Sequence, residues 1–116
     1  MRKNNSRAVG NAYERQIRLE FIELGWKNCQ TSRYASKETD DNKVDLVHTE
    51  PFNVQIKRWS SAPAYQKVLS EMPKTGINII IHKKPNRGEV VVMDKKSFYY
   101  LIEHIGLLAD ARKHDG

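Results

Sequence analysis

The chain has 116 residues, which is enough for one compact domain and leaves little room for a second. Twenty Lys and Arg against 14 Asp and Glu give a formal net charge of +6, a balance typical of proteins that meet polyanions, nucleic acid first among them. A single cysteine, Cys29, excludes an internal disulfide and a thiolate metal cluster, and no run of about 18 apolar residues is present to span a membrane. We therefore expect a soluble, cytoplasmic domain with no membrane partner.

The first expected element is an amphipathic helix from about Ala8 to Gly25, preceded by a basic segment, 1–7, that we predict to be a flexible tail. A short strand is predicted within 26–34, and the polar, charged stretch 35–43 is expected to be a loop. The apolar residues of the helix recur at steps of three and four: Val9, Tyr13, Ile17, Phe21 and Leu24.

Two further strands are predicted at 44–49 and 52–59, around a turn at Glu50-Pro51, and a helix that carries Tyr65, Val68, Leu69 and Met72 follows. The segments 77–82 and 89–94 favour a hairpin, and a last helix precedes a tail at 110–116. Its apolar side is formed by Phe98, Leu101, Ile102, Ile105 and Leu108. The order α-β-β-β-α-β-β-α predicts a single α/β domain over 1–116, with a central mixed five-stranded sheet flanked by helices.

The most informative segments are KVDLV and FNVQIKRW. Because side chains alternate along a strand, Gln55 and Lys57 share one face, and a hairpin around Glu50 would set Asp45 opposite Gln55. A carboxylate and an amide oxygen suit a divalent cation, and a nearby ammonium can orient a water molecule. We therefore interpret Asp45, Gln55 and Lys57 as a candidate catalytic centre with a metal site.

Glu14 is a fourth candidate, since it lies at the edge of the core-facing stripe of the first helix, one turn after Gly10. A carboxylate on a packing face needs a partner, and a metal ion would be one. Each residue also has an ordinary explanation: Gln55 and Lys57 could be the solvent face of a strand, and Glu14 could pair with Arg18 along the helix.

The segments GNAYERQ, KVDLV and FNVQIKRW together resemble the PD-(D/E)XK nuclease superfamily, and within it the small Holliday junction resolvases of archaeal and phage type. In that comparison Gly10, Glu14 and Arg15 correspond to the helical G-x-x-x-E-R pattern of the family. Asp45 corresponds to the metal aspartate, and Gln55 with Lys57 corresponds to the acid-x-lysine pair.

The resemblance implies a restriction-endonuclease-like core and a structure-selective endonuclease that cuts four-way or branched DNA as a homodimer. It implies Mg²⁺, with Mn²⁺ as a substitute, held by Asp45, Gln55 and Glu14. It also fits a phage recombination role, in which case the protein would work in the host cytoplasm.

Gln55 departs from the family pattern, which has glutamate at that position. Glutamine keeps an oxygen for the metal but loses a charge, and Glu38, Asp40 or Asp41 in the preceding loop could compensate or could be a solvated charge run. Three alternatives therefore stay open: a general or sequence-specific duplex nuclease, a DNA-binding module without catalysis, and a basic scaffold or regulator that does not contact DNA. The residues expected to contact DNA are Arg7, Arg15, Arg18, Arg33, Lys37, Arg58 and Trp59.

Overall fold

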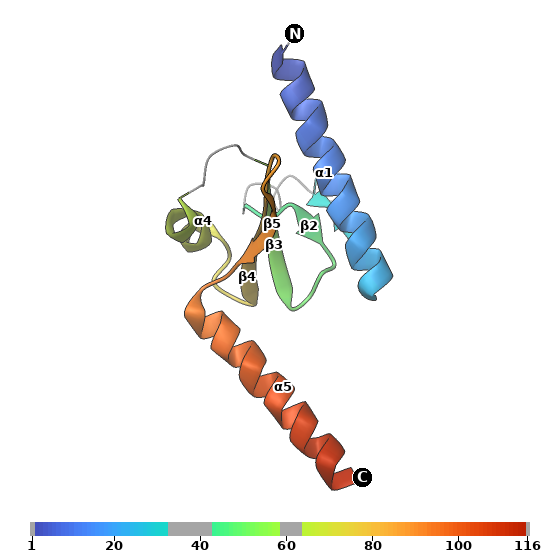
Figure 1. Cartoon of the computed structure of the whole chain (residues 1–116), viewed down its shortest axis with the longest axis vertical. Coiled ribbons are helices and arrows are strands. Elements are labelled where there is room, and N and C mark those ends of the chain that lie inside the picture. Colours follow the sequence, from blue (N-terminus) through green and yellow to red (C-terminus); the bar gives the residue numbers. More distant parts are fainter. Residues whose placement is uncertain (1, 33–42, 59–63, 116) are drawn as a thin grey trace.

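The computed structural model of the chain describes residues 2–32, 43–58 and 64–115, with side chains over 9–32, 43–58 and 64–110. A small β-structure lies between two helices, and a third, long helix extends away from it toward the C-terminus (Figure 1). The elements are α1 (Arg2–Leu24), β1 (Gln30–Thr31), β2 (Leu46–Val47), β3 (Phe52–Arg58), α4 (Tyr65–Glu71), β4 (Ile77–Lys84), β5 (Gly88–Val92) and α5 (Lys95–Asp115). The α/β class and the predicted order of these elements are confirmed.

The predicted five-stranded sheet is wrong for the described residues, because the strands form two sheets. β1 and β2 pair antiparallel over two residues each, whereas β3 pairs parallel with β4, and β4 pairs antiparallel with β5. The chain turns sharply between β2 and β3, where His48 has a positive φ of 63°. Backbone hydrogen bonds from Asp45 N to Val54 O and from Phe52 N to Thr49 O tie the two strands without a continuous ladder.

The core lies between α1 and one face of the β3–β4 pair. Tyr13, Ile17 and Phe21 of α1 pack in one cluster with alternate residues of β3 and β4, including Val54 and Ile79. Parallel strands are buried on both faces, and here α4 covers the second face of the sheet, opposite α1 (Figure 1). Alternation along β3 therefore divides its side chains between the apolar core and the α4 side.

The C-terminus of α1 follows from its sequence. Gly25 has a φ of +123°, a conformation that favours glycine. Its N–H donates to Ile22 O, and the N–H of Trp26 donates to Phe21 O, which together make a Schellman cap. The predicted stop at Gly25 is confirmed, and the backbone turns there to enter β1.

Both long helices reach further than the sequence predicted. α1 begins at Arg2 and α5 continues to Asp115, so 2–7 and 110–115, predicted as flexible tails, are helical. Ala, Arg and Lys at 111–113 have good helix propensity, and such residues extend a helix that is already nucleated. The predicted stripe of α1 is also narrower, because Val9 is 39% exposed and Leu24 is 72% exposed.

Candidate functional site

Asp45 and Gln55 are in direct contact, as the spacing of the two segments predicted. The Asp45 Oδ2 atom accepts a hydrogen bond from Gln55 Nε2 at 3.0 Å and another from the backbone N–H of Ile56 at 2.7 Å. The backbone of Asp45 is fixed on both sides, because its N–H donates to Val54 O and its carbonyl accepts from Ser32 N. The carboxylate is thus anchored between β1 and β3 before any ligand binds.

Gln55 is the residue of this pair with an unsatisfied atom. Its side chain is 6% exposed, and its Oε1 has no hydrogen-bond partner among the described residues. A buried oxygen left without a partner costs about 1–3 kcal/mol. An amide oxygen is also a ligand that divalent cations accept, so the donor chemistry at this position fits the implied metal.

Lys57 lies on the same face of β3 as Gln55, two residues further along. The parallel register sets Lys57 beside His82 of β4, which is 4% exposed. The Nδ1 of His82 is hydrogen-bonded to Tyr65 Oη at 2.9 Å, and this contact ties α4 to the sheet. The register therefore places Lys57 next to the packed Tyr65–His82 pair, on the strand face that also carries Gln55.

Glu14 is half-buried on α1, next to Tyr13 at the border of the core. Tyr13 Oη donates to Glu89 Oε1 at 2.8 Å, which connects α1 to β5. Burial raises the pKa of Tyr13, and the Glu89 carboxylate raises it further. The position of Glu14 fits the predicted edge of the stripe, while its role as a metal ligand stays a prediction.

Because Gln55 stands where the family pattern has glutamate, the candidate metal site has few anionic ligands. Over the residues that the structure describes, no group of three or more His, Cys, Asp or Glu is placed to hold a metal ion. The predicted set of Asp45, Gln55 and Glu14 has two carboxylates and one amide, a donor set that suits Mg²⁺ or Mn²⁺ with water molecules as further ligands. The loop acids Glu38, Asp40 and Asp41 lie outside the described residues.

The residues predicted to contact DNA fall into three groups. Arg15 and Arg18 of α1 line a hollow of about 400 Å³ beside Gln30 and Thr31 of β1. Arg18 also donates from Nε to Cys29 O at 3.0 Å, so part of its guanidinium holds the α1–β1 connection. Arg58, half-buried, ends β3. The remaining residues lie outside the described residues or side chains: Arg7, Arg33, Lys37 and Trp59.

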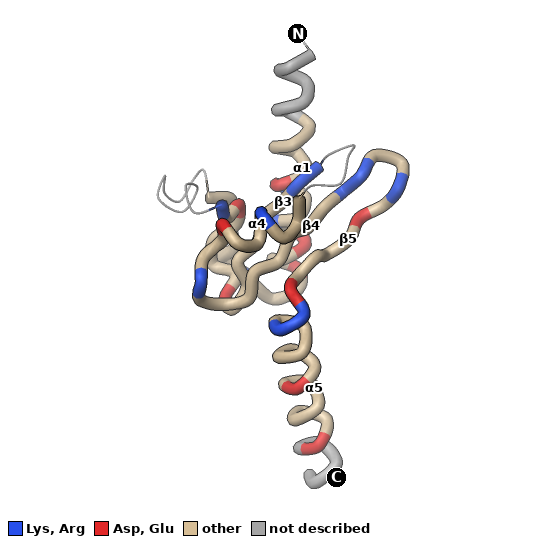
Figure 2. The backbone as a smooth tube through the Cα atoms, turned by 90° about the vertical axis from the view of Figure 1, so that its left-hand side faces the viewer, with Lys and Arg blue, Asp and Glu red and all other residues tan. Residues whose placement is uncertain are grey.

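The sequence interpretation missed a basic group on the β4–β5 hairpin. Arg58 pairs in register with Lys83 of β4, and Lys84 and Arg87 follow at the hairpin turn. Figure 2 shows Lys and Arg positions along the arm that the β4–β5 hairpin forms. The segment KKPNRG was interpreted only as a turn, although three of its six residues are basic.

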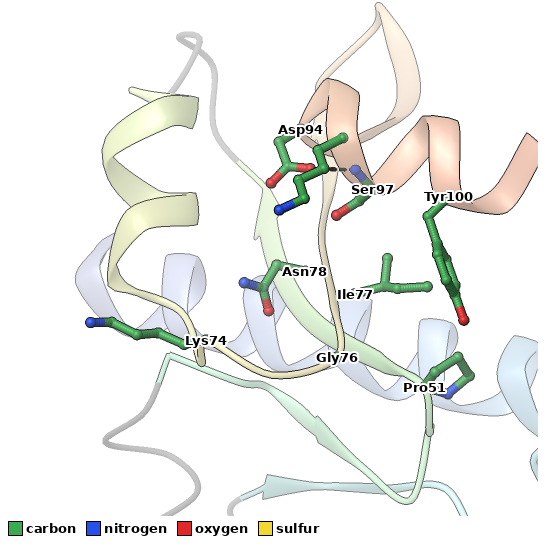
Figure 3. A pocket seen from close by; sticks show the side chains of 9 residues that line it. Pro51, Lys74, Gly76, Ile77, Asn78, Asp94, Ser97 and Tyr100 are labelled. Carbon is green, nitrogen blue, oxygen red and sulfur yellow. Dashed lines mark hydrogen bonds between the residues drawn. The ribbon is translucent and has the colours of Figure 1, made fainter.

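A separate cavity of about 470 Å³ lies where α5 leaves the sheet (Figure 3). Its walls include Pro51, Asn78, Ser97 and Tyr100, and none of the predicted site residues lines it. Asp94 accepts a hydrogen bond from Ser97 N at 2.7 Å and so caps α5. That bond lowers the pKa of the Asp94 carboxyl. The cavity therefore belongs to the base of α5 and not to the Asp45 site.

No family model, curated protein or solved structure matches the chain. Among the described residues, none of the helices combines the length and apolar character needed to cross a bilayer.

Proposed function

We propose that the protein is a metal-dependent DNA endonuclease of the PD-(D/E)XK type, acting as a homodimer on four-way or otherwise branched DNA. The observation that supports this best is the Asp45–Gln55 hydrogen bond, on the strand face that also carries Lys57. Asp45, Gln55 and Lys57 all lie in the segments that resemble the nuclease family. Asp45 and Gln55 are in contact.

Asp45, Gln55 and Glu14 would hold the divalent cation. When bound, the cation supplies positive charge against the scissile phosphate and activates water. The Ile56 N–H holds the Asp45 carboxylate in place, which limits its side-chain freedom. The oxygen of Gln55 is buried and short of a partner, so a cation would satisfy it.

Lys57 acts on the water and the phosphate. An ammonium group with three donors can orient the attacking water and can hydrogen-bond a non-bridging phosphate oxygen as charge develops there. The parallel register places Lys57 beside His82, on the face of β3 that also carries Gln55. The proton released by the water passes to solvent or to a phosphate oxygen.

Basic residues around the site would bind the DNA backbone. Arg15 and Arg18 lie toward β1, and Lys84 lies on the sheet face of Lys57 and His82. Arg58 and Lys83 lie on the opposite face, where Lys83 Nζ is 5.6 Å from the centre of the Tyr13 ring. Phosphate contacts of this kind give affinity without sequence preference, and that affinity falls as salt rises.

Asp45→Asn and Lys57→Ala test the proposal. Each variant should cut DNA more slowly by on the order of a thousandfold. Asparagine retains an oxygen that can accept from Ile56 N and from Gln55, so Asp45→Asn should keep its unfolding temperature. The assay uses end-labelled four-way junction, flap, linear duplex and single strand with Mg²⁺ or Mn²⁺. A well-folded Asp45→Asn protein with full activity would contradict the proposal, and equal cutting of linear duplex would favour a general nuclease.

A DNA-binding module without catalysis is the second candidate, and one observation favours it. The Gln55 amide donates a hydrogen bond to Asp45, just before β2. In a module without catalysis, this bond would have the structural role of joining the start of β2 to β3. Titration calorimetry with Mn²⁺ separates the two. A nuclease should bind the ion, and Gln55→Glu should bind it more tightly, whereas a silent module should show no binding in the wild-type protein.

A further inference from the structure

The C-terminal helix α5 leaves large apolar side chains in solvent. Phe98, Ile102, Ile105 and Leu108 are 50%, 49%, 63% and 53% exposed. The helix extends away from the sheet along most of its length (Figure 1). Contiguous apolar surface of this extent on a soluble protein marks a site that another surface covers.

The spacing of these residues is that of a helix–helix seam. Phe98, Leu101, Ile105 and Leu108 are separated by three, four and three residues, which is the a/d pattern of a heptad repeat. Leu101 is half-buried and packs against the core of its own chain, while Ile105 and Leu108 continue the same line past the end of the core. The stripe therefore begins on the domain and goes on beyond it.

The exposed area is close to what a stable dimer needs. A standard interface buries about 800 Å² per partner, of which about 60% is apolar, or roughly 480 Å². On and beside the seam, four side chains that are about half exposed offer roughly 400 Å² of apolar surface: Phe98, Ile102, Ile105 and Leu108. With 21 residues, α5 is roughly 31 Å long, so the seam spans a contact of ordinary size.

We propose that this face of α5 binds the same face of α5 in a second copy of the chain, with the two helices antiparallel. In that arrangement Phe98 meets the partner's Leu108 and Leu101 meets the partner's Ile105. Antiparallel pairing keeps the two domains, in chains of net charge +6 each, at opposite ends of the helix pair.

The seam on α5 would be the contact surface of the homodimer in the proposed function. The evidence for it is the exposure of the α5 side chains, which is independent of the nuclease centre. Leucine at 107 and leucine at 108 provide a matched pair for the test. Leu108 lies on the seam, and Leu107, 64% exposed, points to the other side of the helix. The same change to glutamate at each position therefore separates the seam from exposure in general.

Sedimentation equilibrium of the full chain measures the result. Wild type and Leu107→Glu should have twice the monomer mass, and Leu108→Glu should be monomeric. Its dissociation constant should rise about a hundredfold or more, because each dimer loses two buried leucines and gains two desolvated carboxylates. If Leu108→Glu unfolds by circular dichroism, Ile105→Ala and Leu108→Ala replace it, and each should weaken the dimer without loss of helix.

The proposal is overturned if wild type stays monomeric up to about 100 µM, a range that covers specific dimers. Co-sedimentation with anionic vesicles would then ask whether lipid covers the face instead. Equal masses of the Leu107 and Leu108 variants would also overturn it. The nuclease assay is independent, since Asp45→Asn should stay dimeric. A monomeric wild type that cuts DNA refutes the seam and the homodimer but not the nuclease, and an inactive dimer refutes the nuclease alone.

Discussion

The centre of the β3–β4 pair and the helix α5 carry equally apolar side chains but bury them very differently. Val54 and Ile80 are 0% exposed, whereas Ile105 and Leu108 are more than half exposed. α1 and α4 cover the two faces of the sheet, and none of the other described helices or strands lies beside the far half of α5 (Figure 1). The comparison shows that an amphipathic pattern predicts a face that must be covered, but not whether the same chain covers it.

Isoleucine-to-alanine substitutions should show the largest difference in unfolding free energy between the two regions. Ile80→Ala should lower the free energy of unfolding by about 2–5 kcal/mol, because it removes fully buried methyl groups. Ile105→Ala should change it by less than about 0.5 kcal/mol in dilute protein. Urea unfolding at a concentration that keeps the protein monomeric measures both. Equal losses would show that α5 packs on its own domain.

Gly76 directly precedes β4, and a substitution there measures how closely the packed region around it is filled. Its φ is +84°, and an added Cβ would lie 2.9 Å from Pro51 O and 3.0 Å from Asn53 Nδ2. Gly76→Ala should cost about 3 kcal/mol, from the backbone conformation and the contact together. Gly88→Ala is the control, because it has a φ of +101° with nothing within 4 Å of the new atom. It should cost about 1 kcal/mol, and equal costs would mean that the contact at Gly76 relaxes.

Asp94, at the junction of the two regions, should give a smaller effect than Ile80 or Gly76. Asp94→Ala removes the cap of α5 and should cost about 1 kcal/mol at pH 7. The hydrogen bond lowers the folded pKa of this carboxyl, so its stabilisation is fully present above the ordinary value of 3.8 and is lost as pH falls through the lowered folded pKa.

The difference in unfolding free energy between wild type and Asp94→Ala should therefore shrink as the pH falls below the ordinary value of 3.8. Asp94→Asn keeps a capping oxygen without a titrating charge, so its difference from Asp94→Ala should not vary with pH. Thermal unfolding above and below this pH measures both, and a constant difference between wild type and Asp94→Ala would contradict the role of the carboxylate.

Much of the fold could be predicted because hydrophobic periodicity is local. The order of elements, the Gly25 stop and the two strands β3 and β4 all follow from patterns within one segment. The division into two sheets could not be predicted, since the choice of β4 as the partner of β3 depends on contacts 25 residues apart. The length of α5 was underestimated because its last residues are polar, and polarity does not end a helix that is already formed.

The candidate site shows the same division. Strand alternation predicted that Asp45 would reach Gln55, and the 3.0 Å hydrogen bond confirms it. Periodicity carries no information about which polar side chains a neighbouring strand adds, so His82 beside Lys57 and Lys83 beside Arg58 were missed. Glu14 could be placed at the edge of a face but not at a distance from the aspartate.

The parallel pairing of β3 with β4 also sets the order in which the molecule is built. Phe52 lies beside Ile77 and Arg58 beside Lys83, so β3 stays without its partner until the whole crossover through α4 has been synthesised. Closing that loop precedes the gain from burial, so we expect it to be the slow step of domain folding. α5 is synthesised after the sheet, so the domain can fold before the proposed pairing of two α5 helices.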